Sequence, residues 1–417
     1  MVNPFSRVTM AAKKLLMIVC DGLSDRPSRK HDMKTPLQSA RKPAMDSVAR
    51  HGISGNMDVI DHGVIPGSDT AHLALFGYDP YSVYTGRGPI EAAGAGIDLV
   101  QGDVAFRCNF ASVDKNLVVR DRRAGRIKSG TAELAKAVSG MELDGVKVIV
   151  REGSEHRAVL VLRGNGLDHR VTDVDPHQEA RILESKPLAP EAARTAQILN
   201  EFVNKSSEIL ASHPVNLERI KAGLPPANII LPRGAGSIGI LEPFEKRYGL
   251  KAGAVAGVTL VKGICRMVGM EAPNIPGATG GVDTDYRAKA EATLKMLDRK
   301  EFVFVNVKAG DVAGHDGDFS LKVHVVENID MMLGMILKDI GEEVILALTC
   351  DHSTPVSVRE HSADPVPVSI AGSGVRVDGV KEFDEISCAS GALHRIKGVN
   401  LMPIMLGIAD RAKKFGA

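Results

Sequence analysis

The segments Phe302-Val303-Phe304-Val305-Asn306-Val307 and Val344-Ile345-Leu346-Ala347-Leu348-Thr349-Cys350 decide the fold of this chain. Both are predominantly apolar runs of the length expected for strands that are buried on both faces of a sheet. Each is followed by an acid and an imidazole: Asp311 and His315 in the loop 308–315 after the first run, and Asp351 and His352 directly after the second. Because an open α/β sheet binds ligands outside the carboxyl ends of its parallel strands, this pattern predicts a metal site at that edge.

A third strand is expected at residues 15–20, where another apolar run ends in Asp21-Gly22. Taken alone, Asp21 is a turn residue, but beside the two acid and imidazole pairs it is a third carboxylate at a strand end. His361 adds an imidazole shortly after Asp351. Mixed aspartate and histidine ligation suits Mn²⁺ or Zn²⁺, with Mg²⁺ as an alternative when water completes the shell.

A glycine-led loop and a short helix that stops at Gly77 are expected within residues 66–77. Ser68 then lies at or near the helix N-cap, where unpaired amides and the helix dipole stabilise an anion. Such a serine is most often only a cap, but two cations beside it would activate its hydroxyl for in-line phosphoryl transfer. Lys262 is a candidate for a further positive charge near the phosphate, and a solvated lysine at a helix end is the alternative.

The composition bounds the class of protein. Its 417 residues exceed what one hydrophobic core usually serves, so two domains are expected. A net charge of +1 gives no support for binding nucleic acid. Five scattered cysteines without a CxxC pair suggest neither a disulfide framework nor a structural zinc module, which favours the cytoplasm. No apolar run has the length of a membrane span or of a convincing signal segment, so no membrane partner is expected.

Alternating strand-like and helix-like segments predict an α/β fold with a mainly parallel central sheet flanked by helices. Residues 78–224 differ, because they combine many glycines and alanines with short strand-like runs and a dense group of arginines. We therefore expect a discontinuous metal-binding domain, residues 1–77 and 225–417, and an inserted smaller α+β domain, residues 78–224, that binds substrate and acts as a lid. Helices are expected at 43–50, 190–210 and 286–297, and further strands at 148–150, 157–162 and 228–231.

Residues Gly234-Ala235-Gly236-Ser237-Ile238-Gly239 match the GxGxxG fingerprint of dinucleotide-binding proteins. However, Pro243 interrupts the helix that should bind the phosphates, and residues 255–262 supply no carboxylate for a ribose. We therefore expect no nucleotide cofactor, and a tight turn between domains at these glycines.

Several motifs occur in a fixed order: Asp21-Gly22, Pro66-Gly67-Ser68-Asp69-Thr70-Ala71-His72, Phe76-Gly77-Tyr78-Asp79-Pro80, Thr85-Gly86-Arg87-Gly88-Pro89, Asp311-x-x-x-His315, Asp351-His352-Ser353 and His361. Together they resemble the alkaline-phosphatase superfamily, and within it the archaeal-type 2,3-bisphosphoglycerate-independent phosphoglycerate mutases. The resemblance covers essentially the whole chain. It implies interconversion of 3-phosphoglycerate and 2-phosphoglycerate in glycolysis and gluconeogenesis, with two divalent cations, Mn²⁺ first among them, and no requirement for 2,3-bisphosphoglycerate.

The resemblance also implies roles for individual residues. Ser68 would be the nucleophile that becomes phosphoserine, and Lys262 is carried over as a catalytic residue from its Lys-Gly context. One metal would be surrounded by Asp21, Ser68, Asp351 and His352, and the other by Asp311, His315 and His361.

A mutase must keep glycerate bound while it turns, since the phosphoserine would otherwise react with water. Arginines suit this task because they pair bidentately with a carboxylate. Candidates for substrate binding in the inserted domain are Arg107, Arg120, Asp121, Arg122, Arg123, Arg126 and Arg157, and for each one alone a solvated surface residue is the alternative.

Two other interpretations stay open. A phosphopentomutase or a phosphomonoesterase of the same superfamily would share the metal ligands and differ in the lid. A metal-stabilised binding protein without turnover is the second, although all seven expected ligand positions are filled. The expected partner is a small phosphoglycerate, with self-association into a homo-oligomer as an open possibility.

Overall fold

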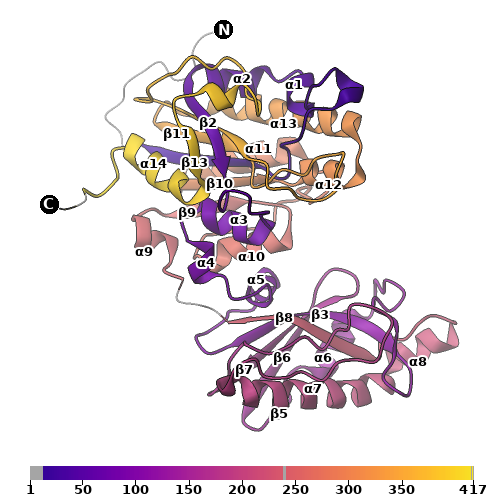
Figure 1. The fold of residues 1–417 in the computed structure, drawn as a ribbon. Coiled ribbons are helices and arrows are strands. Elements are labelled where there is room, and N and C mark those ends of the chain that lie inside the picture. Colours follow the sequence, from indigo (N-terminus) through magenta and orange to yellow (C-terminus); the bar gives the residue numbers. More distant parts are fainter. Residues whose placement is uncertain (1–12, 238–240, 415, 417) are drawn as a thin grey trace. The chain divides into compact units, whose positions relative to one another are not determined.

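The computed structural model describes residues 13–237, 241–414 and 416. The chain divides into two compact units, one formed by the residues up to Val83 together with those from Glu242 onward, and the other by Tyr84 to Leu241. Figure 1 traces both units along the chain. Each unit contains its own sheet, so each is described by itself.

Within the described residues, seven strands form the sheet of the first unit, in the order β13-β2-β12-β11-β1-β10-β9. Parallel pairing joins β1 to β10 and β11, β10 to β9, and β13 to β2, whereas β12 is antiparallel to both of its neighbours. The predicted α/β fold with a mainly parallel central sheet is therefore confirmed. The strands are β1 (Lys14–Cys20), β2 (Gly52–Asp58), β9 (Ala252–Val255), β10 (Phe302–Val307), β11 (Val344–Thr349), β12 (Val366–Ala371) and β13 (His394–Lys397).

β1 lies between β10 and β11 at the centre of this sheet, where Leu15 pairs with Phe302 on one side and with Ile345 on the other. Every residue of β10 and β11, and all of β1 except its first, is buried. This burial on both faces explains why the three strands are predominantly apolar rather than alternating between apolar and polar residues. Because all three run in the same direction, the residues that follow them emerge at one edge of the sheet.

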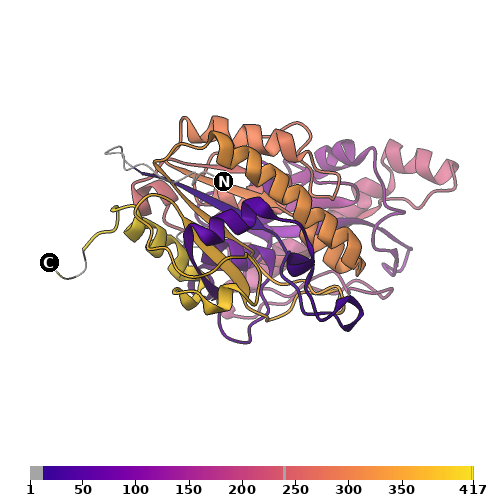
Figure 2. The same ribbon diagram turned by 90° about the horizontal axis from the view of Figure 1, so that it is seen from above.

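Helices cover both faces of this sheet, as Figures 1 and 2 show. One face carries α1 (Pro36–Ser39), α2 (Pro43–Arg50), α11 (Tyr286–Leu297) and α13 (Phe319–Asp339), and the other carries α3 (Ser68–Leu75), α10 (Thr259–Met267) and α14 (Leu401–Ile408). The connecting helices are α4 (Pro80–Val83), α9 (Phe244–Tyr248) and α12 (Ala309–Asp316), with 3-10 turns at 29–31, 388–390 and 398–400. Among the described residues, no helix has the length and apolar character that a membrane span requires.

The second unit is built on an antiparallel sheet in which β3 (Val104–Val113) pairs with β4 (Val119–Asp121), β7 (Arg157–Arg163) and β8 (Ile229–Ser237). β6 (Val146–Glu152) joins β7 to β5 (Glu142–Leu143). One face of β3 contributes Val104, Phe106, Cys108 and Phe110 to the main core of this unit. The helices of the unit are α5 (Gly88–Gly94), α6 (Thr131–Val138), α7 (Ala193–Ala211) and α8 (Pro214–Lys221), with a 3-10 turn at 190–192.

Most predicted elements are confirmed. The helices expected at 43–50 and 286–297 match α2 and α11, and the strands expected at 15–20, 302–307 and 344–350 match β1, β10 and β11 within one residue at each end. The helix expected at 190–210 begins as a 3-10 turn and continues as α7. The shorter strands expected at 148–150 and 157–162 lie within β6 and β7, and 228–231 covers the start of β8.

Residues 308–315 were expected to form a loop, and this was wrong. They form most of α12, which has no proline to interrupt it and which packs closely through its glycines. A Cβ at Gly314 would lie only 2.3 Å from the carbonyl oxygen of Thr354, so glycine is needed for this helix to approach the loop after β11.

The glycines at 234 and 236 were expected in a tight turn, which was also wrong, because residues 234–237 extend β8 along β3. Ile238 and Gly239 of the same motif lie outside the described residues. The pairing with β3 places all of β8 in the second unit, so the division of the chain falls after Leu241 rather than after residue 224. The first division falls after Val83 rather than after residue 77.

Candidate active site

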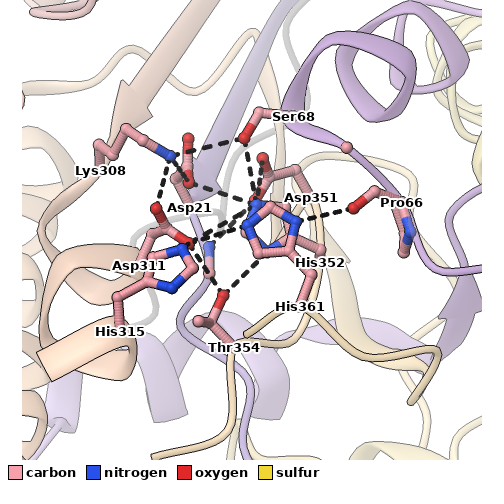
Figure 3. Close-up of polar contacts among 12 residues, drawn as sticks. Asp21, Pro66, Ser68, Lys308, Asp311, His315, Asp351, His352, Thr354 and His361 are labelled. Atoms are coloured by element: carbon pink, nitrogen blue, oxygen red, sulfur yellow. Dashed lines mark hydrogen bonds and ion pairs between the residues drawn. The ribbon is translucent and has the colours of Figure 1, made fainter. Parts of the chain in front are cut away.

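The side chains at the carboxyl edge of the first unit's sheet come from four segments. Asp21 follows β1, and Asp351 and His352 follow β11. Asp311 lies in the first turn of α12, just after β10, and Ser68 is the first residue of α3. Figure 3 shows these side chains gathered around a common centre.

The first cluster consists of Ser68, Asp21, Asp351 and His352. Nε2 of His352 lies 3.2 Å from Oγ of Ser68, 3.6 Å from Oδ1 of Asp21 and 3.4 Å from Oδ2 of Asp351. All four residues are buried. The amide of Gly22 donates to Oδ1 of Asp351, whereas Oδ2 of Asp351 is buried and has no hydrogen-bond partner within the described part of the chain. A buried carboxylate oxygen in this state is suited to a bound cation.

The second cluster is centred on Asp311. Its Oδ1 lies 3.3 Å from Nε2 of His315, 3.3 Å from Nε2 of His361 and 3.9 Å from Nε2 of His352. Nδ1 of both His315 and His361 lies 2.8 Å from a backbone carbonyl oxygen, which accepts from Nδ1–H and leaves Nε2 available to a metal. His352 takes part in both groups, since its ligand atom lies within 4.8 Å of those of Asp21 and Asp351 and of those of Asp311 and His361.

The electrostatics of the clusters fit bound cations. Burial and the negative charge of Asp21 raise the pKa of Asp351 well above its usual value. Burial alone would also raise the pKa of Asp21, but the positive charge of Lys308 lowers it. Burial lowers the pKa of His352 to about 3, which keeps its imidazole neutral and able to ligate. Because two buried carboxylates this close resist ionising together, a divalent cation between them would stabilise both.

Lys308 touches both clusters, and our sequence analysis gave it no role. Its Nζ lies 2.9 Å from Oδ1 of Asp21, 2.8 Å from Oδ2 of Asp311 and 3.5 Å from Oγ of Ser68. Burial would lower the pKa of Lys308, but the charges of Asp21 and Asp311 raise it, so the side chain is protonated. The feature of the sequence that could have identified Lys308 is its position three residues before Asp311, at the start of a helix, where the two side chains can meet.

Asn306 and His72 support the same site. Nδ2 of Asn306 donates to Oδ2 of Asp21 over 2.9 Å and lies 3.2 Å from Nε2 of His72. Nδ1 of His72 contacts the backbone carbonyl of Ser68. Both residues are fully buried. Asn306 could have been identified from the sequence, because an asparagine inside an apolar strand needs hydrogen-bond partners when it is buried.

Lys262 lies within α10 rather than at a helix end, and its Nζ donates to Oδ1 of Asn274 over 2.9 Å. Burial lowers its pKa. Among the described residues, no hydrogen bond or ion pair joins Lys262 to Ser68 or to the metal-ligand candidates. A catalytic role for Lys262 stays a prediction.

In the second unit, arginines from several strands lie near one another. Arg107 of β3 pairs in register with Arg233 of β8, and its pKa is lowered to about 10 by burial and by the positive charges of Arg87, Arg233 and Arg157. Nε of Arg107 is buried, lies 3.7 Å from a carboxylate oxygen of Glu91, and has no hydrogen-bond partner among the residues that the structure describes. Sequence analysis did not select Arg87 or Arg233, because Arg233 reaches Arg107 through strand pairing and Arg87 through the packing of the start of α5 against β3.

The other arginine candidates have different surroundings. Arg120 pairs with Asp114 over 2.7 Å, and Arg122 makes a bidentate pair with Asp175 over 2.6 and 3.0 Å. Asp121 accepts from the amides of Arg123 and Gly125 and so holds a turn.

A serine at a helix start, beside two groups of carboxylates and imidazoles at the carboxyl edge of a mainly parallel sheet, defines an alkaline-phosphatase-like protein. The chain is 52% identical over 413 residues to 2,3-bisphosphoglycerate-independent phosphoglycerate mutase 1 of Methanocaldococcus jannaschii, which covers 98% of this chain and 100% of the relative. It belongs to the 2,3-bisphosphoglycerate-independent phosphoglycerate mutase family.

Further comparisons agree with this membership. The family model described as 2,3-bisphosphoglycerate-independent phosphoglycerate mutase matches residues 49–216. The relative of the same name from Methanosphaera stadtmanae is 50% identical over 410 residues, covering 97% of this chain and 100% of the relative. The solved structure of a cofactor-independent phosphoglycerate mutase from Thermoplasma acidophilum matches with a TM-score of 0.76 and 39% identity over 95% of this chain and 100% of that one. A Pyrococcus horikoshii protein matches with a TM-score of 0.85 and 40% identity, covering 97% and 100%.

Proposed function

We propose that this protein interconverts 3-phosphoglycerate and 2-phosphoglycerate through a phosphoserine at Ser68, with two divalent cations and without 2,3-bisphosphoglycerate. The observation that carries the proposal is the 3.2 Å between Oγ of Ser68 and Nε2 of His352, inside two clusters of metal-ligand type. Family membership supports the same activity. The reaction belongs to glycolysis and gluconeogenesis in the cytoplasm.

The proposed cations are held by the residues of the two clusters. One lies among Asp21, Ser68, Asp351 and His352, and the other among Asp311, His315 and His361. The mixture of carboxylate and imidazole donors favours Mn²⁺, with Mg²⁺ or Zn²⁺ as alternatives. When bound, the cations neutralise charge on the transferring phosphoryl oxygens and lower the pKa of the serine hydroxyl.

The chemistry of the chain's own residues follows from this placement. Oγ of Ser68 forms a bond to phosphorus as the bond from phosphorus to the 3-oxygen of the substrate breaks, and the proton that Ser68 loses replaces the phosphoryl group on that oxygen. The same steps in reverse, with the 2-hydroxyl as acceptor, give 2-phosphoglycerate and restore the serine. The ammonium of Lys308, 3.5 Å from Oγ of Ser68, stabilises the developing negative charge there.

We propose that the second unit is the substrate-binding lid. Glycerate must stay bound between the two transfers, and a carboxylate is well recognised by a group of guanidinium groups. Arg107 is favoured as a member of this group by its positive neighbours Arg87, Arg157 and Arg233 and by its Nε, which makes no hydrogen bond among the described residues and lies 3.7 Å from Glu91. Arg123 stays a candidate, whereas the ion pairs of Arg120 and Arg122 with acids of this chain speak against a direct role for those two.

An enolase-coupled assay tests the proposal. Purified protein is stripped with a chelator, divided, and reloaded with Mn²⁺, Mg²⁺ or Zn²⁺ before 3-phosphoglycerate is added. We expect no activity in the stripped protein and a return of activity with Mn²⁺. Release of inorganic phosphate without any 2-phosphoglycerate would make the protein a phosphatase. Turnover of a pentose phosphate in preference to phosphoglycerate would make it a phosphopentomutase.

A further inference from the structure

Thr354 connects the two clusters. It lies two residues after His352, in the loop that follows β11, and it is fully buried. Its Oγ1 lies 3.0 Å from Nδ1 of His352 and 2.9 Å from Oδ1 of Asp311. Figure 3 shows this hydroxyl in contact with one member of each cluster.

The single proton of the hydroxyl fixes the direction of these two hydrogen bonds. An ionised carboxylate only accepts, so the hydroxyl of Thr354 donates to Asp311 and accepts from Nδ1–H of His352. The imidazole of His352 therefore carries its proton on Nδ1. Its Nε2, which lies 3.2 Å from Oγ of Ser68, is left with a lone pair directed into the first cluster.

The backbone of Thr354 is held in place from several sides. Its amide donates to the carbonyl of Ser24 over 3.2 Å, and its carbonyl accepts from Nζ of Lys322 over 2.8 Å. Gly314 and Gly22 allow close approach, since a Cβ at these positions would lie 2.3 Å from the carbonyl oxygen and 2.7 Å from Oγ1 of Thr354. The position of the hydroxyl is therefore set by the fold and not by its own rotamer preference.

We propose that Thr354 is a positioning residue that couples the two cation sites, by fixing the tautomer of His352 at one site and the ligand oxygen of Asp311 at the other. This inference rests on the pair of divalent cations in the proposed function. Groups that orient a metal ligand are typically worth about 10- to 100-fold in metal affinity. Because one hydroxyl orients a ligand of each site, its loss weakens both binding steps together.

The test is cation binding by the full-length protein, stripped with a chelator and titrated calorimetrically with Mn²⁺ in the absence of substrate. Thr354→Val keeps the shape of the side chain and removes the hydroxyl. We expect both binding steps of this variant to be about 10-fold or more weaker, with the thermal unfolding of the stripped protein little changed. Thr354→Ser keeps the hydroxyl and is expected to bind both cations as the unmodified protein does.

Three results would overturn the proposal: unmodified affinity at both steps in the valine variant, weakening at one step only, or equal weakening by valine and serine. If the valine variant does not fold, Thr354→Ala is compared with Thr354→Ser in the same way. Nitrogen-15 NMR of the histidines adds a second readout. In the unmodified protein and in Thr354→Ser, His352 should show the signal of a protonated Nδ1. In the valine variant, which lacks the hydroxyl, it should show signals of both tautomers. A wild-type protein that binds two cations but forms no 2-phosphoglycerate would refute the proposed function and leave this result standing.

Discussion

Oγ of Ser68 lies 3.2 Å from Nε2 of His352, although 284 positions separate the two residues in the chain. Ser68 opens α3, and His352 follows β11 at the centre of the sheet. Their approach is a product of strand order, because β2, which precedes α3, and β11 are both antiparallel to β12 between them and therefore end at the same edge. Both residues are buried, so the surroundings of the hydroxyl are largely fixed before any substrate arrives.

Replacing Ser68 with alanine should abolish mutase turnover. Without Oγ no phosphoserine can form, and we expect kcat in the enolase-coupled assay to fall on the order of 10⁴-fold or more. Ser54→Ala is the matched control, since Ser54 is a buried serine of β2 whose hydroxyl is hydrogen-bonded to that of Ser369. It should keep nearly full activity. Substantial turnover by Ser68→Ala would remove this residue from the proposed role.

Replacing Lys308 with methionine should separate catalysis from metal binding. The ammonium stabilises charge near Oγ of Ser68, so its loss should lower kcat by about 10²-fold. The same ammonium repels a cation held by Asp21 and Asp311, so Mn²⁺ affinity should stay equal or rise. Steady-state kinetics and Mn²⁺ titration check both parts. A larger loss of kcat in Lys262→Met than in Lys308→Met would contradict this prediction and would support Lys262, the residue that the sequence suggested, as the catalytic lysine.

The sequence allowed the ligand candidates to be found because strand ends are local features. An apolar run followed by Asp21, or by Asp351 and His352, needs no knowledge of the rest of the chain to be noticed. The parallel sheet then follows from the alternation of such runs with helices. The same reasoning misjudged residues 234–237, because a glycine such as Gly236, which permits close approach to Pro89, looks like a turn glycine until the pairing of β8 with β3 is known.

The residues that were missed depend on long-range packing. A threonine such as Thr354 in a loop is ordinary, and its contact with Asp311 exists only because α12 packs against that loop through Gly314. Arg233 becomes a candidate for substrate binding only once β8 is seen to pair with β3, because that pairing places it beside Arg107. Asn306 lies in β10 and Lys308 follows this strand directly, but their partner Asp21 follows a different strand, β1, so the sequence does not show the contact.

Replacing Lys322 with methionine should destabilise the first unit. Nζ of this fully buried lysine lies 2.8 Å from Oδ2 of Asp25 and also donates to the carbonyls of Ser24 and Thr354. Removing it leaves the buried carboxylate of Asp25 with its backbone amide donors but without its charged partner, and breaking a buried ion pair in this way typically costs about 3–5 kcal/mol. Denaturant unfolding of the stripped protein measures the loss. The double variant with Asp25→Asn should recover part of it, and a loss below about 1 kcal/mol in the single variant would contradict the prediction.

Replacing Arg107 with lysine should weaken substrate binding. Lysine keeps the charge but loses the planar fork that pairs with a carboxylate, so we expect KM for 3-phosphoglycerate to rise about 10-fold with a smaller change in kcat. Arg120→Lys is the control, because Arg120 is engaged with Asp114 on an exposed part of the unit. Equal KM values for the two variants would exclude Arg107 from the substrate site.

Glu385 should make the unfolding free energy depend on pH between about 4.5 and 7. Burial raises the pKa of this carboxyl from 4.5 to about 7, while it accepts hydrogen bonds from the amide of Asp25 and the hydroxyl of Thr35. In that window the native state keeps the proton and the unfolded state releases it, so stability falls as the pH rises. The shift corresponds to about 3 kcal/mol.

Between pH 5 and pH 8, the free energy of unfolding of the unmodified protein should therefore fall by about 2–3 kcal/mol more than that of Glu385→Gln. The control Glu382→Gln, which changes an exposed carboxyl, should follow the unmodified protein. Equal losses in the unmodified protein and Glu385→Gln would show that the carboxyl of Glu385 titrates alike in both states.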